Sequence, residues 1–395
     1  MDAPTLRFEE FTDGWLSKNL GEISRITSGG TPSRSNKSFW GGDIPWVTTA
    51  EIKFGLIKNS QEKITAIGLK NSSAKIFPKG TLLMAMYGQG KTRGQVAKLG
   101  IDAATNQACA AILLEKEVSQ EYVLQYLGNQ YENIRSLSND GGQKNLSSAL
   151  VKEIPIWLPS IDEQTKIANF LTAVDTKISH LTKKHELLTL YKKGVMQKIF
   201  SRELRFKDDN GREFPDWNEV ELQNLCEMNP KTGLLPETFV YIDLESVEKG
   251  VLLKQTVISK NEAPSRAQRV LQKEDVLFQM VRPYQGNNLF FNETGAFVAS
   301  TGYAQIRASE DPRFIYQYLH LESFTAEVIN RCTGTSYPAI NSGDLGSIEI
   351  SLPSRPEQAK IASFLTAIDG KITNVKSQLE AAKGYKQGLL QQMFV

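Results

Sequence analysis

The chain has 395 residues, enough for two or three domains, and its 40% hydrophobic and 23% charged residues are ordinary for a soluble globular protein. The formal net charge is +2, and no apolar run approaches the ~18 residues of a membrane span. The acidic N-terminus is not a signal peptide. Three scattered cysteines, Cys109, Cys226 and Cys332, match neither a metal site nor a disulfide framework. These features predict a cytoplasmic protein without membrane contact.

Residues 1–157 are expected to form a first globular domain. Short β-rich runs such as 44–48 and 81–84 alternate with Gly, Asn, Ser and Pro, a pattern typical of strands joined by turns. One helix is predicted near the end of the domain, around 119–137. The fold class is therefore α+β.

The first domain carries loops that are suited to contact nucleic acid. The stretch 88–94 is rich in glycine and resembles a phosphate-binding loop, but Ala85 occupies the place of that motif's first glycine, so an ATPase is not favoured. Glycines let backbone amides approach phosphates, while Lys and Arg supply charge and Gln can pair with an adenine edge. An ordinary solvated hairpin tip is the alternative. The candidate DNA-contacting residues of this domain are Ser33, Arg34, Lys37, Gln89, Lys91, Thr92, Arg93, Gln143 and Lys144.

Residues 158–203 form a helical region that the sequence repeats at 352–395. A shift of 194 residues superimposes 158–200 on 352–394 without a gap, and about half of the aligned positions are identical. Each copy begins with Leu-Pro-Ser and a Ser-x-x-Glu capping box, which predicts a helix start. Because solenoid repeats are only 20–50 residues long, this period indicates a duplicated half-molecule.

Apolar residues in each copy keep a seven-residue period over about five heptads, which is typical of a coiled-coil seam. An amphipathic helix packed only on its own domain is the alternative, but two matched copies favour pairing with each other. The seam is predicted to consist of Ile167, Leu171, Val174, Ile178, Leu181 and Leu188 in the first copy, and Ile361, Leu365, Ile368, Ile372, Val375 and Leu379 in the second.

Residues 204–351 form a second globular domain with the same frame and different loops. A helix is predicted around 311–330, and residues 206–351 carry 13 Lys and Arg against 21 Asp and Glu. This negative balance argues against a polycation that grips DNA over its whole surface. Arg can fork onto guanine, and Gln or Asn suit adenine, although Asn and Gly also simply make turns. The candidates here are Arg282, Tyr284, Gln285, Asn287, Asn288, Thr301, Tyr303, Thr335, Ser336 and Tyr337.

No catalytic set is recognisable in the sequence. The signature of amino-methyltransferases is absent, since Asn229-Pro230 continues into Lys231 and Asp311-Pro312 into Arg313. His180 and His185 fit a solvated helix face and a seam position better than a metal pair. The residues thus predict a non-catalytic chain without a metal or cofactor of its own.

The whole chain resembles the specificity subunits of type I restriction–modification enzymes. The resemblance rests on the doubled Leu-Pro-x-x-x-Glu-Gln-x-x-Ile-Ala helix starts and on the stretches 29–33 and 40–47. It implies two globular target-recognition domains separated by two long helices that pair as an antiparallel coiled coil, with pseudo-twofold symmetry. Each domain would read one half of a bipartite, asymmetric site in double-stranded DNA, and the helices would set the spacer.

The resemblance also implies partners. The helices would dock two modification subunits, which methylate adenine N6 with S-adenosylmethionine, and restriction subunits that use ATP and Mg would then join. A 40-residue helix spans ~60 Å at 1.5 Å per residue, enough to hold two readers on one duplex. A coiled-coil scaffold for protein partners, without DNA reading, is the alternative, and the acidic second domain favours it slightly.

Overall fold

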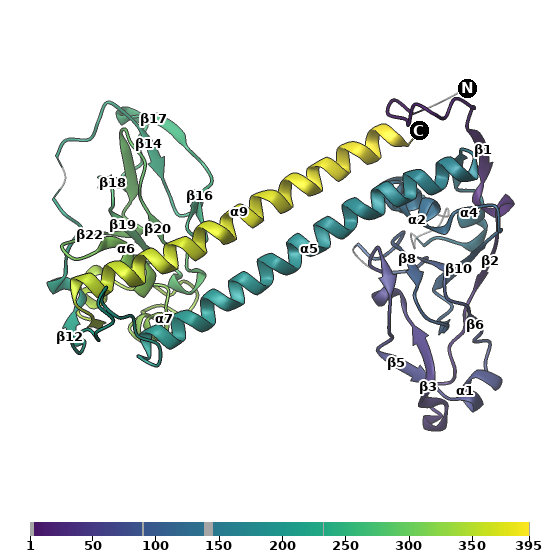
Figure 1. Ribbon diagram of the computed structural model, residues 1–395, viewed down its shortest axis with the longest axis horizontal. Helices are drawn as coiled ribbons and strands as arrows, with labels where there is room; N and C mark the ends of the chain where they lie inside the picture. Colours follow the sequence, from purple (N-terminus) through teal and green to yellow (C-terminus); the bar gives the residue numbers. More distant parts are fainter. Residues whose placement is uncertain (1–3, 89–90, 138–144, 232, 395) are drawn as a thin grey trace. The chain divides into compact units, whose positions relative to one another are not determined.

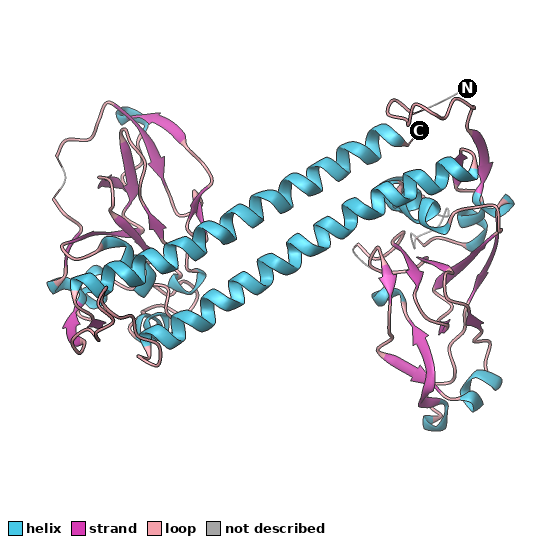
Figure 2. Ribbon diagram, viewed as in Figure 1, coloured by secondary structure: helices cyan, strands magenta, loops and turns pink. Residues whose placement is uncertain are grey.

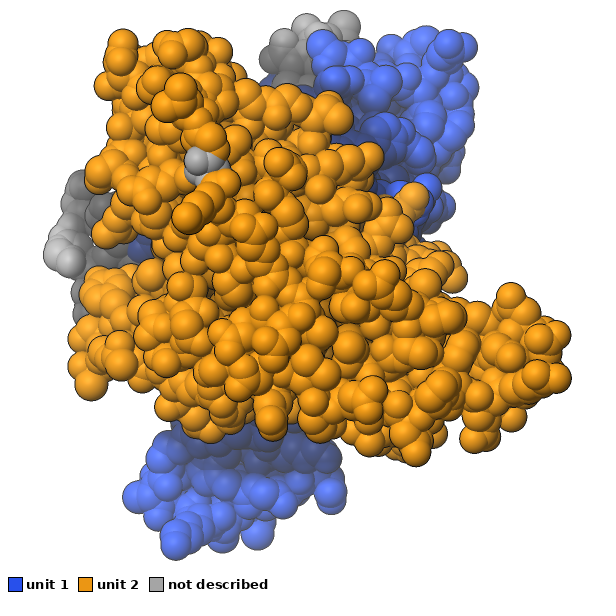
Figure 3. Space-filling model, turned by 90° about the vertical axis from the view of Figure 1, so that its left-hand side faces the viewer, with its two compact units in different colours: residues 1–182, 377–395 blue, residues 183–376 orange. Residues whose placement is uncertain are grey.

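The computed structural model describes residues 4–88, 91–137, 145–231 and 233–394. The chain divides into two compact units, coloured separately in Figure 3: unit 1 is Met1–Thr182 with Ser377–Val395, and unit 2 is Lys183–Lys376. Each unit combines one globular domain with half of each long helix, α5 (Ile161–Phe200) and α9 (Arg355–Met393). The border between the units therefore lies within the helices, whereas the sequence predicts domain borders near the helix ends.

Unit 1 contains two sheets and a short antiparallel ribbon of β1 and β11. The five-stranded sheet has the order β2-β10-β7-β8-β4, and the four-stranded sheet has the order β5-β3-β9-β6 with β3 parallel to β9. The strands are β1 (Leu16–Asn19), β2 (Ser24–Ser28), β3 (Trp40–Val47), β4 (Leu56–Ile57), β5 (Glu62–Ile64), β6 (Ile76–Phe77), β7 (Leu82–Ala85), β8 (Val96–Leu99), β9 (Ala103–Thr105), β10 (Cys109–Leu114) and β11 (Pro155–Leu158).

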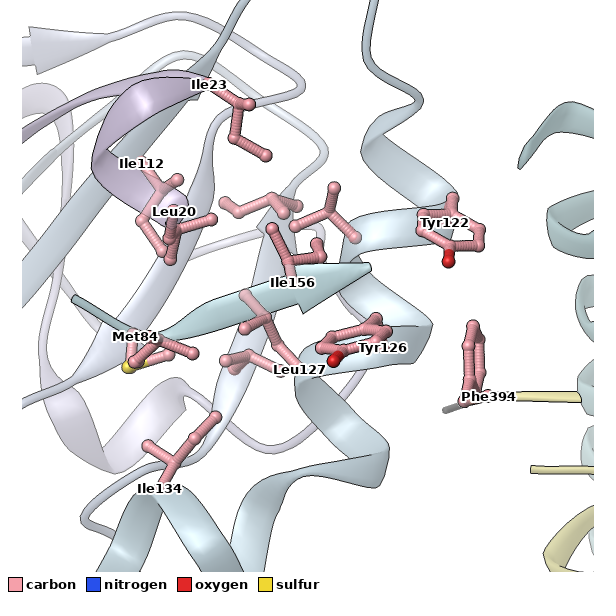
Figure 4. Close-up of a cluster of buried hydrophobic side chains, with 14 of the residues drawn as sticks. Leu20, Ile23, Met84, Ile112, Tyr122, Tyr126, Leu127, Ile134, Ile156 and Phe394 are labelled. Carbon is pink, nitrogen blue, oxygen red and sulfur yellow. The ribbon is translucent and has the colours of Figure 1, made fainter. Parts of the chain in front are cut away.

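The helices of unit 1's globular domain are short: α1 (Ala66–Lys70), α2 (Gln120–Asn129), α3 (Tyr131–Ser136) and α4 (Ser148–Lys152). The single helix predicted around 119–137 is thus two helices, because the backbone leaves helical geometry at Gln130. Ser119 caps α2 by accepting a hydrogen bond from the Tyr122 amide. Figure 4 shows Tyr122 and Tyr126 of α2 beside Phe394, with ring centroids 5.5 and 5.4 Å from that ring. The far end of the chain therefore completes the core of the first domain.

Unit 2 repeats this plan. A four-stranded sheet β13-β22-β19-β20 and a second sheet β17-β14-β21-β18 accompany the ribbons β12-β23 and β15-β16. The strands are β12 (Asn218–Glu221), β13 (Cys226–Met228), β14 (Thr238–Ile242), β15 (Val247–Glu248), β16 (Val251–Leu252), β17 (Thr256–Ser259), β18 (Ala267–Val270), β19 (Val276–Gln279), β20 (Leu289–Phe290), β21 (Phe297–Ser300), β22 (Tyr303–Ala308) and β23 (Glu349–Leu352).

The helices of the second domain are α6 (Pro312–Tyr318), α7 (Glu322–Asn330) and α8 (Ser342–Gly346). The helix predicted around 311–330 is again two helices. Phe200, at the end of α5, packs against Trp217, Phe314 and Tyr318 with centroid distances of 6.1, 5.8 and 5.2 Å. Phe200 thus has in unit 2 the place that Phe394 has in unit 1.

The long helices α5 and α9, both uninterrupted in Figure 2, run antiparallel to each other within each unit. In unit 1, Lys386 forms an ion pair with Asp175 at 2.7 Å; in unit 2, Lys192 forms the equivalent pair with Asp369 at 2.7 Å. Figure 1 labels both helices. Since position 175 corresponds to 369 and 192 to 386, the two pairs are copies of one contact, and the coiled coil is antiparallel.

The apolar stripe lies on the buried side of both helices. Ile167 and Leu171 join the core of unit 1, while Ile361, Leu365 and Ile368 join the core of unit 2. The other predicted seam residues are buried (Leu181, Val375, Leu379) or half-buried (Val174, Ile178, Leu188, Ile372). Among the described residues, no helix is long and apolar enough to cross a membrane.

The capping-box prediction is wrong for the glutamates. Ser160 does accept a hydrogen bond from the Glu163 amide, at 3.4 Å, but the hydroxyl of Ser354 is buried without a hydrogen-bond partner. Glu163 and Glu357 do not reach back to the caps, because each accepts hydrogen bonds from an arginine near the start of its own domain. The glutamates therefore fasten the domains to the helices.

Candidate nucleic-acid interface

The candidate loops of unit 2 meet at the end of strand β19. The Met280 amide donates to the Gly302 carbonyl at 3.0 Å, and the Ile340 amide donates to the Met280 carbonyl at 3.1 Å. The Arg282 amide donates to the Pro338 carbonyl at 2.8 Å. Three segments that are distant in sequence, 280–288, 300–303 and 333–340, thus form one junction.

Two of these hydrogen bonds recur in unit 1 at positions shifted by 194. The Met86 amide donates to the Ala108 carbonyl at 2.8 Å, and the Leu146 amide donates to the Met86 carbonyl at 3.0 Å. The loop around 29–36 joins this junction, since Thr31 donates to the side chain of Gln107 and the Gly30 amide to the Thr105 carbonyl. A Cβ on Gly29 would collide with the carbonyl oxygen of Thr105, so this close approach requires glycine.

Several candidates are exposed and available at these junctions. In unit 1, Ser33, Lys37 and Lys91 are exposed and Thr92 is half-buried. In unit 2, Tyr284, Thr335, Ser336 and Tyr337 are exposed and Thr301 is half-buried. Gln89, Gln143 and Lys144 lie outside the described residues.

Two arginines of unit 1 are held by the protein itself. Arg34 forms a bidentate ion pair with Glu62 and stacks over Trp40 at 3.8 Å. The hydrogen bonds between these groups raise the pKa of Arg34 and lower that of Glu62. Arg93 donates from Nη2 to the carbonyl of Arg135 at 2.8 Å. Both guanidinium groups already donate hydrogen bonds within the protein, so fewer of their N–H groups are available to bind a base.

Four candidates of unit 2 have hydrogen-bond partners within the protein, and two of them, Tyr303 and Asn288, are buried. Tyr303 is fully buried, and its hydroxyl donates to the Asp243 carbonyl at 3.4 Å, so its side chain cannot reach a ligand. The side-chain oxygen of Asn288 accepts from the Gln279 amide at 2.9 Å, and that of Asn287 from the Lys249 amide at 3.0 Å. Gln285 accepts from the side-chain amide of Gln279 at 2.8 Å. The side-chain oxygens of these three residues hold the turn together. Turn formation is the alternative to base contact that the sequence leaves open.

Neither the sequence motif nor the fold supports a phosphate-binding loop after strand β7. Ala85 is buried at the end of β7, and the loop leads into strand β8 rather than into a helix. The described residues between β7 and β8 contain no helix, so this loop has no helix N-terminus there to hold a phosphate.

Within the described parts of the chain, no group of three or more His, Cys, Asp or Glu residues is placed to hold a metal ion. Burial raises the pKa of the Cys109 and Cys226 thiols to about 12, so both stay protonated and unreactive at neutral pH. The arrangement thus offers exposed hydrogen-bonding and cationic groups for binding.

The contacts that fix each domain to the helices are duplicated, and sequence reasoning missed them. Arg7 donates to both carboxylate oxygens of Glu163 at 2.7 and 2.8 Å, and Arg205 donates to those of Glu357 at 3.2 and 2.8 Å. These hydrogen bonds raise the pKa of both arginines. The signal was present in the sequence as the repeated Leu-Arg-Phe at 6–8 and 204–206.

A second duplicated anchor involves the aspartates of the helix ion pairs. Gln125 of α2 donates to Asp175 at 2.7 Å, and Gln317 of α6 donates to Asp369 at 2.7 Å. Each aspartate thus binds a lysine of the opposite helix and a glutamine of its own domain. Domain, helix and partner helix meet at one carboxylate in each unit.

Comparisons with known proteins identify the family to which this architecture belongs. The family model for the type I restriction modification DNA specificity domain matches residues 12–190 and 215–383. The chain is similar to the type I restriction enzyme MjaIX specificity subunit of Methanocaldococcus jannaschii, with 25% identity over 95% of this chain and 91% of that protein. It is also similar to the EcoR124I/EcoR124II specificity subunit of Escherichia coli, with 28% identity over 45% of this chain and 44% of that protein.

A solved structure, the type I restriction–modification S subunit from M. genitalium, matches the fold with a TM-score of 0.68. The match covers 100% of this chain and 99% of that one, at 16% identity. The family match covers both halves of the duplicated chain, each with its target-recognition domain and its helix. This chain belongs to the family of type I restriction–modification DNA specificity subunits.

Proposed function

We propose that this chain reads a bipartite, asymmetric sequence in double-stranded DNA, with one half-site contacted by each unit. The observation that carries the proposal is the repeated junction around Met86 and Met280. Two backbone hydrogen bonds, one donated and one accepted by the methionine, recur in both junctions, while the exposed side chains around them differ. A conserved frame with different side chains is what two readers of different half-sites require.

The long helices are proposed to set the spacer and to dock two modification subunits. Tyr191 and its copy Tyr385 are both exposed, at 54% and 56%, although aromatic side chains usually pack against a partner. In this scheme S-adenosylmethionine belongs to the modification subunits, which methylate adenine N6, and ATP and Mg belong to restriction subunits. This chain would supply recognition and binding surfaces, with no chemistry or cofactor of its own, in the cytoplasm.

A scaffold that joins protein partners without touching DNA is the second candidate, because residues 206–351 carry more acidic than basic side chains. The two functions differ in salt dependence. DNA binding through phosphate contacts weakens steeply as salt concentration rises, because counterions are released on binding. An assembled complex without salt-dependent, sequence-specific DNA binding would support the scaffold.

The decisive experiment exchanges residues 206–351 for the corresponding domain of another family member and maps methylated adenines in a host that also expresses the modification subunit. One half of the recognised sequence should change, while the other half and the spacer stay. A matched exchange of residues 1–157 should change the other half. A change of both halves in either chimera would show that the units do not read independently.

A further inference from the structure

The backbone at Arg282 has a left-handed conformation that is unusual for a residue with a side chain. Its φ and ψ are both 54°, and it lies in the junction loop that follows β19. The residue of unit 1 at the position shifted by 194 is Gly88, whose φ of 147° is also positive but differs from that of Arg282. Glycine adopts such backbone without a steric penalty, whereas a Cβ makes it unfavourable. Unit 2 therefore carries an arginine at a position where glycine is the unstrained choice.

Backbone strain alone does not single out Arg282. Glu274 also has a positive φ, of 72°, and its counterpart in unit 1 is Gly80 with φ of 95°. Glu274 is exposed in the turn before β19, away from the junction. A feature other than backbone conformation must therefore distinguish Arg282 from Glu274.

Arg282 is distinguished by the contacts of its guanidinium group. It lies 4.4 Å from the ring centre of Tyr337, an exposed residue of the third junction segment. Among the described residues no carboxylate forms an ion pair with it, in contrast to Arg34, which Glu62 holds. The backbone is fixed on both sides, since the Arg282 amide donates to Pro338 and its carbonyl accepts from the Gln285 amide. The guanidinium group, which has no ion-pair partner in the described part of the chain, is thus held over an aromatic ring in a loop whose backbone is hydrogen-bonded on both sides.

Resting on the proposed function, we propose that Arg282 is a specificity-determining residue that forks onto the O6 and N7 atoms of a guanine in the half-site read by unit 2. Arginine presents paired N–H donors in a plane, which matches the two acceptors of guanine in the major groove. Stacking on Tyr337 restricts the orientation of that plane. The side-chain oxygens of Gln285, Asn287 and Asn288 accept hydrogen bonds within the protein, and Arg282 is the one residue of this loop with a planar pair of cationic N–H donors.

The test uses the full chain assembled with its modification subunit and compares three variants. Arg282→Gly removes the side chain and relieves the backbone, Arg282→Lys keeps the charge without the fork, and Glu274→Gly relieves the matched backbone site outside the junction. Binding is measured against a library randomised in both half-sites, with the salt dependence of affinity and the midpoint of thermal unfolding for each protein.

Arg282→Gly should lose about 5- to 150-fold of the preference for a G·C pair at one position, while its unfolding midpoint stays at or above that of the parent. Arg282→Lys should lose the same preference and keep the salt dependence. Glu274→Gly should keep the full sequence preference. The half-site read by unit 1 should be unchanged in all three.

A uniform loss of affinity for every sequence, with a salt slope lowered by about one, would instead make Arg282 a phosphate contact and overturn the inference. An unchanged preference in Arg282→Gly, with the parent still reading a bipartite site, would also overturn it and leave the proposed function standing. Absence of any sequence preference in the parent complex would refute the proposed function itself.

Discussion

The helical regions and the junction loops are both duplicated. The two copies of the helical regions share side-chain contacts, whereas the two junctions share backbone hydrogen bonds. In the helices the side-chain contacts themselves are kept, because Asp175 and Asp369 each bind a lysine of the opposite helix and a glutamine of the adjoining domain. In the junctions two backbone hydrogen bonds around Met86 and Met280 are kept, and Gly88 in one corresponds by position to Arg282 in the other. A side chain with several partners resists substitution, while a loop fixed through its backbone leaves its side chains free to change.

The largest effect is expected from charges placed in both copies of the helix seam. Leu171 and Leu365 are fully buried, each in the core of its own unit. Leu171→Asp with Leu365→Asp should lower the free energy of unfolding by roughly 3–5 kcal/mol per unit, the range for an uncompensated buried charge. Chemical denaturation and assembly with the modification subunit measure the effect.

The matched control changes the next residue in each copy, Thr172→Asp with Thr366→Asp, since both threonines are exposed. That variant should stay within about 0.5 kcal/mol of the parent. Equal stability of the two double mutants would show that the seam is assigned to the wrong helix face.

A second variant tests the helices as a spacer. One heptad inserted after Lys183 and one after Ser377 lie at the border between the units and keep the phase of the seam. Each adds ~10.5 Å, or about three base pairs, and would turn one reader by about 100° around the duplex. Methylation of the original site should fall sharply, and any recovered site should contain the same half-sites with a longer spacer.

The measurement is a methylation screen against a library with every spacer length. Undiminished methylation at the original spacing would leave the helices as docking surfaces only.

A subtler comparison concerns the two anchoring glutamates. Glu357 accepts from Arg205 and also from Trp217 Nε1 at 3.0 Å, whereas Trp15 Nε1 in unit 1 is buried without a hydrogen-bond partner. Glu163→Ala should cost about 2 kcal/mol through its charged hydrogen bonds, and Glu357→Ala about 1 kcal/mol more, because it also leaves an indole unpaired.

Urea denaturation of both variants checks this order, with Asp162→Ala at an exposed first-turn position as a control expected to lose less than about 1 kcal/mol. Equal losses for the two glutamates would mean that the hydrogen bond from Trp217 contributes nothing.

The smallest expected effect belongs to the Arg34–Glu62 pair, which is partly exposed. The hydrogen bonds from Arg34 lower the pKa of Glu62 from its ordinary value of 4.5. The contribution to stability is therefore present above pH 4.5 and lost as the pH falls through the lowered value of the folded protein. Glu62→Gln should reduce stability by less than about 1 kcal/mol at pH 7.

Unfolding midpoints of parent and variant should converge as the solution is acidified below pH 4.5, while Glu117→Gln, at an exposed position, should not change the profile. A constant difference between parent and Glu62→Gln at all pH values would contradict the role of the ionised carboxylate.

The helices and the duplication could be predicted from the sequence because both leave a period that is visible in the residues themselves. The antiparallel coiled coil is confirmed by the fold, and the two domains follow from punctuation by Gly, Asn and Pro. The repeated Leu-Arg-Phe marks Arg7 and Arg205 as shared features, but it does not name their partners, since Glu163 lies 156 residues from Arg7. An acidic residue three positions after a serine fits a capping box equally well.

The candidate site was harder to predict because one residue type serves two purposes. Asn288 and Gln285 have the amides that pair with adenine, yet the same amides satisfy backbone and side-chain groups within a tight turn. Tyr303 was wrongly chosen as a candidate for DNA contact, because it begins strand β22, where the side chain points into the core. Residue type gave candidates, and only the packing showed which side chains remain available.

The hydrogen bond from the Leu6 amide to the Gln392 carbonyl, 2.9 Å long, has its copy in the bond from Leu204 to Lys198. In unit 2 the bonded segments are neighbours in the chain, but in unit 1 they come from opposite ends of it. All of unit 2 therefore precedes, in the order of synthesis, the segment of α9 that belongs to unit 1. The domain of residues 1–157 is made before unit 2, yet its core needs residues 377–394, including Leu389, Met393 and Phe394. Translation that stops before this segment leaves the N-terminal domain with an open apolar face, which quality-control proteases and chaperones recognise.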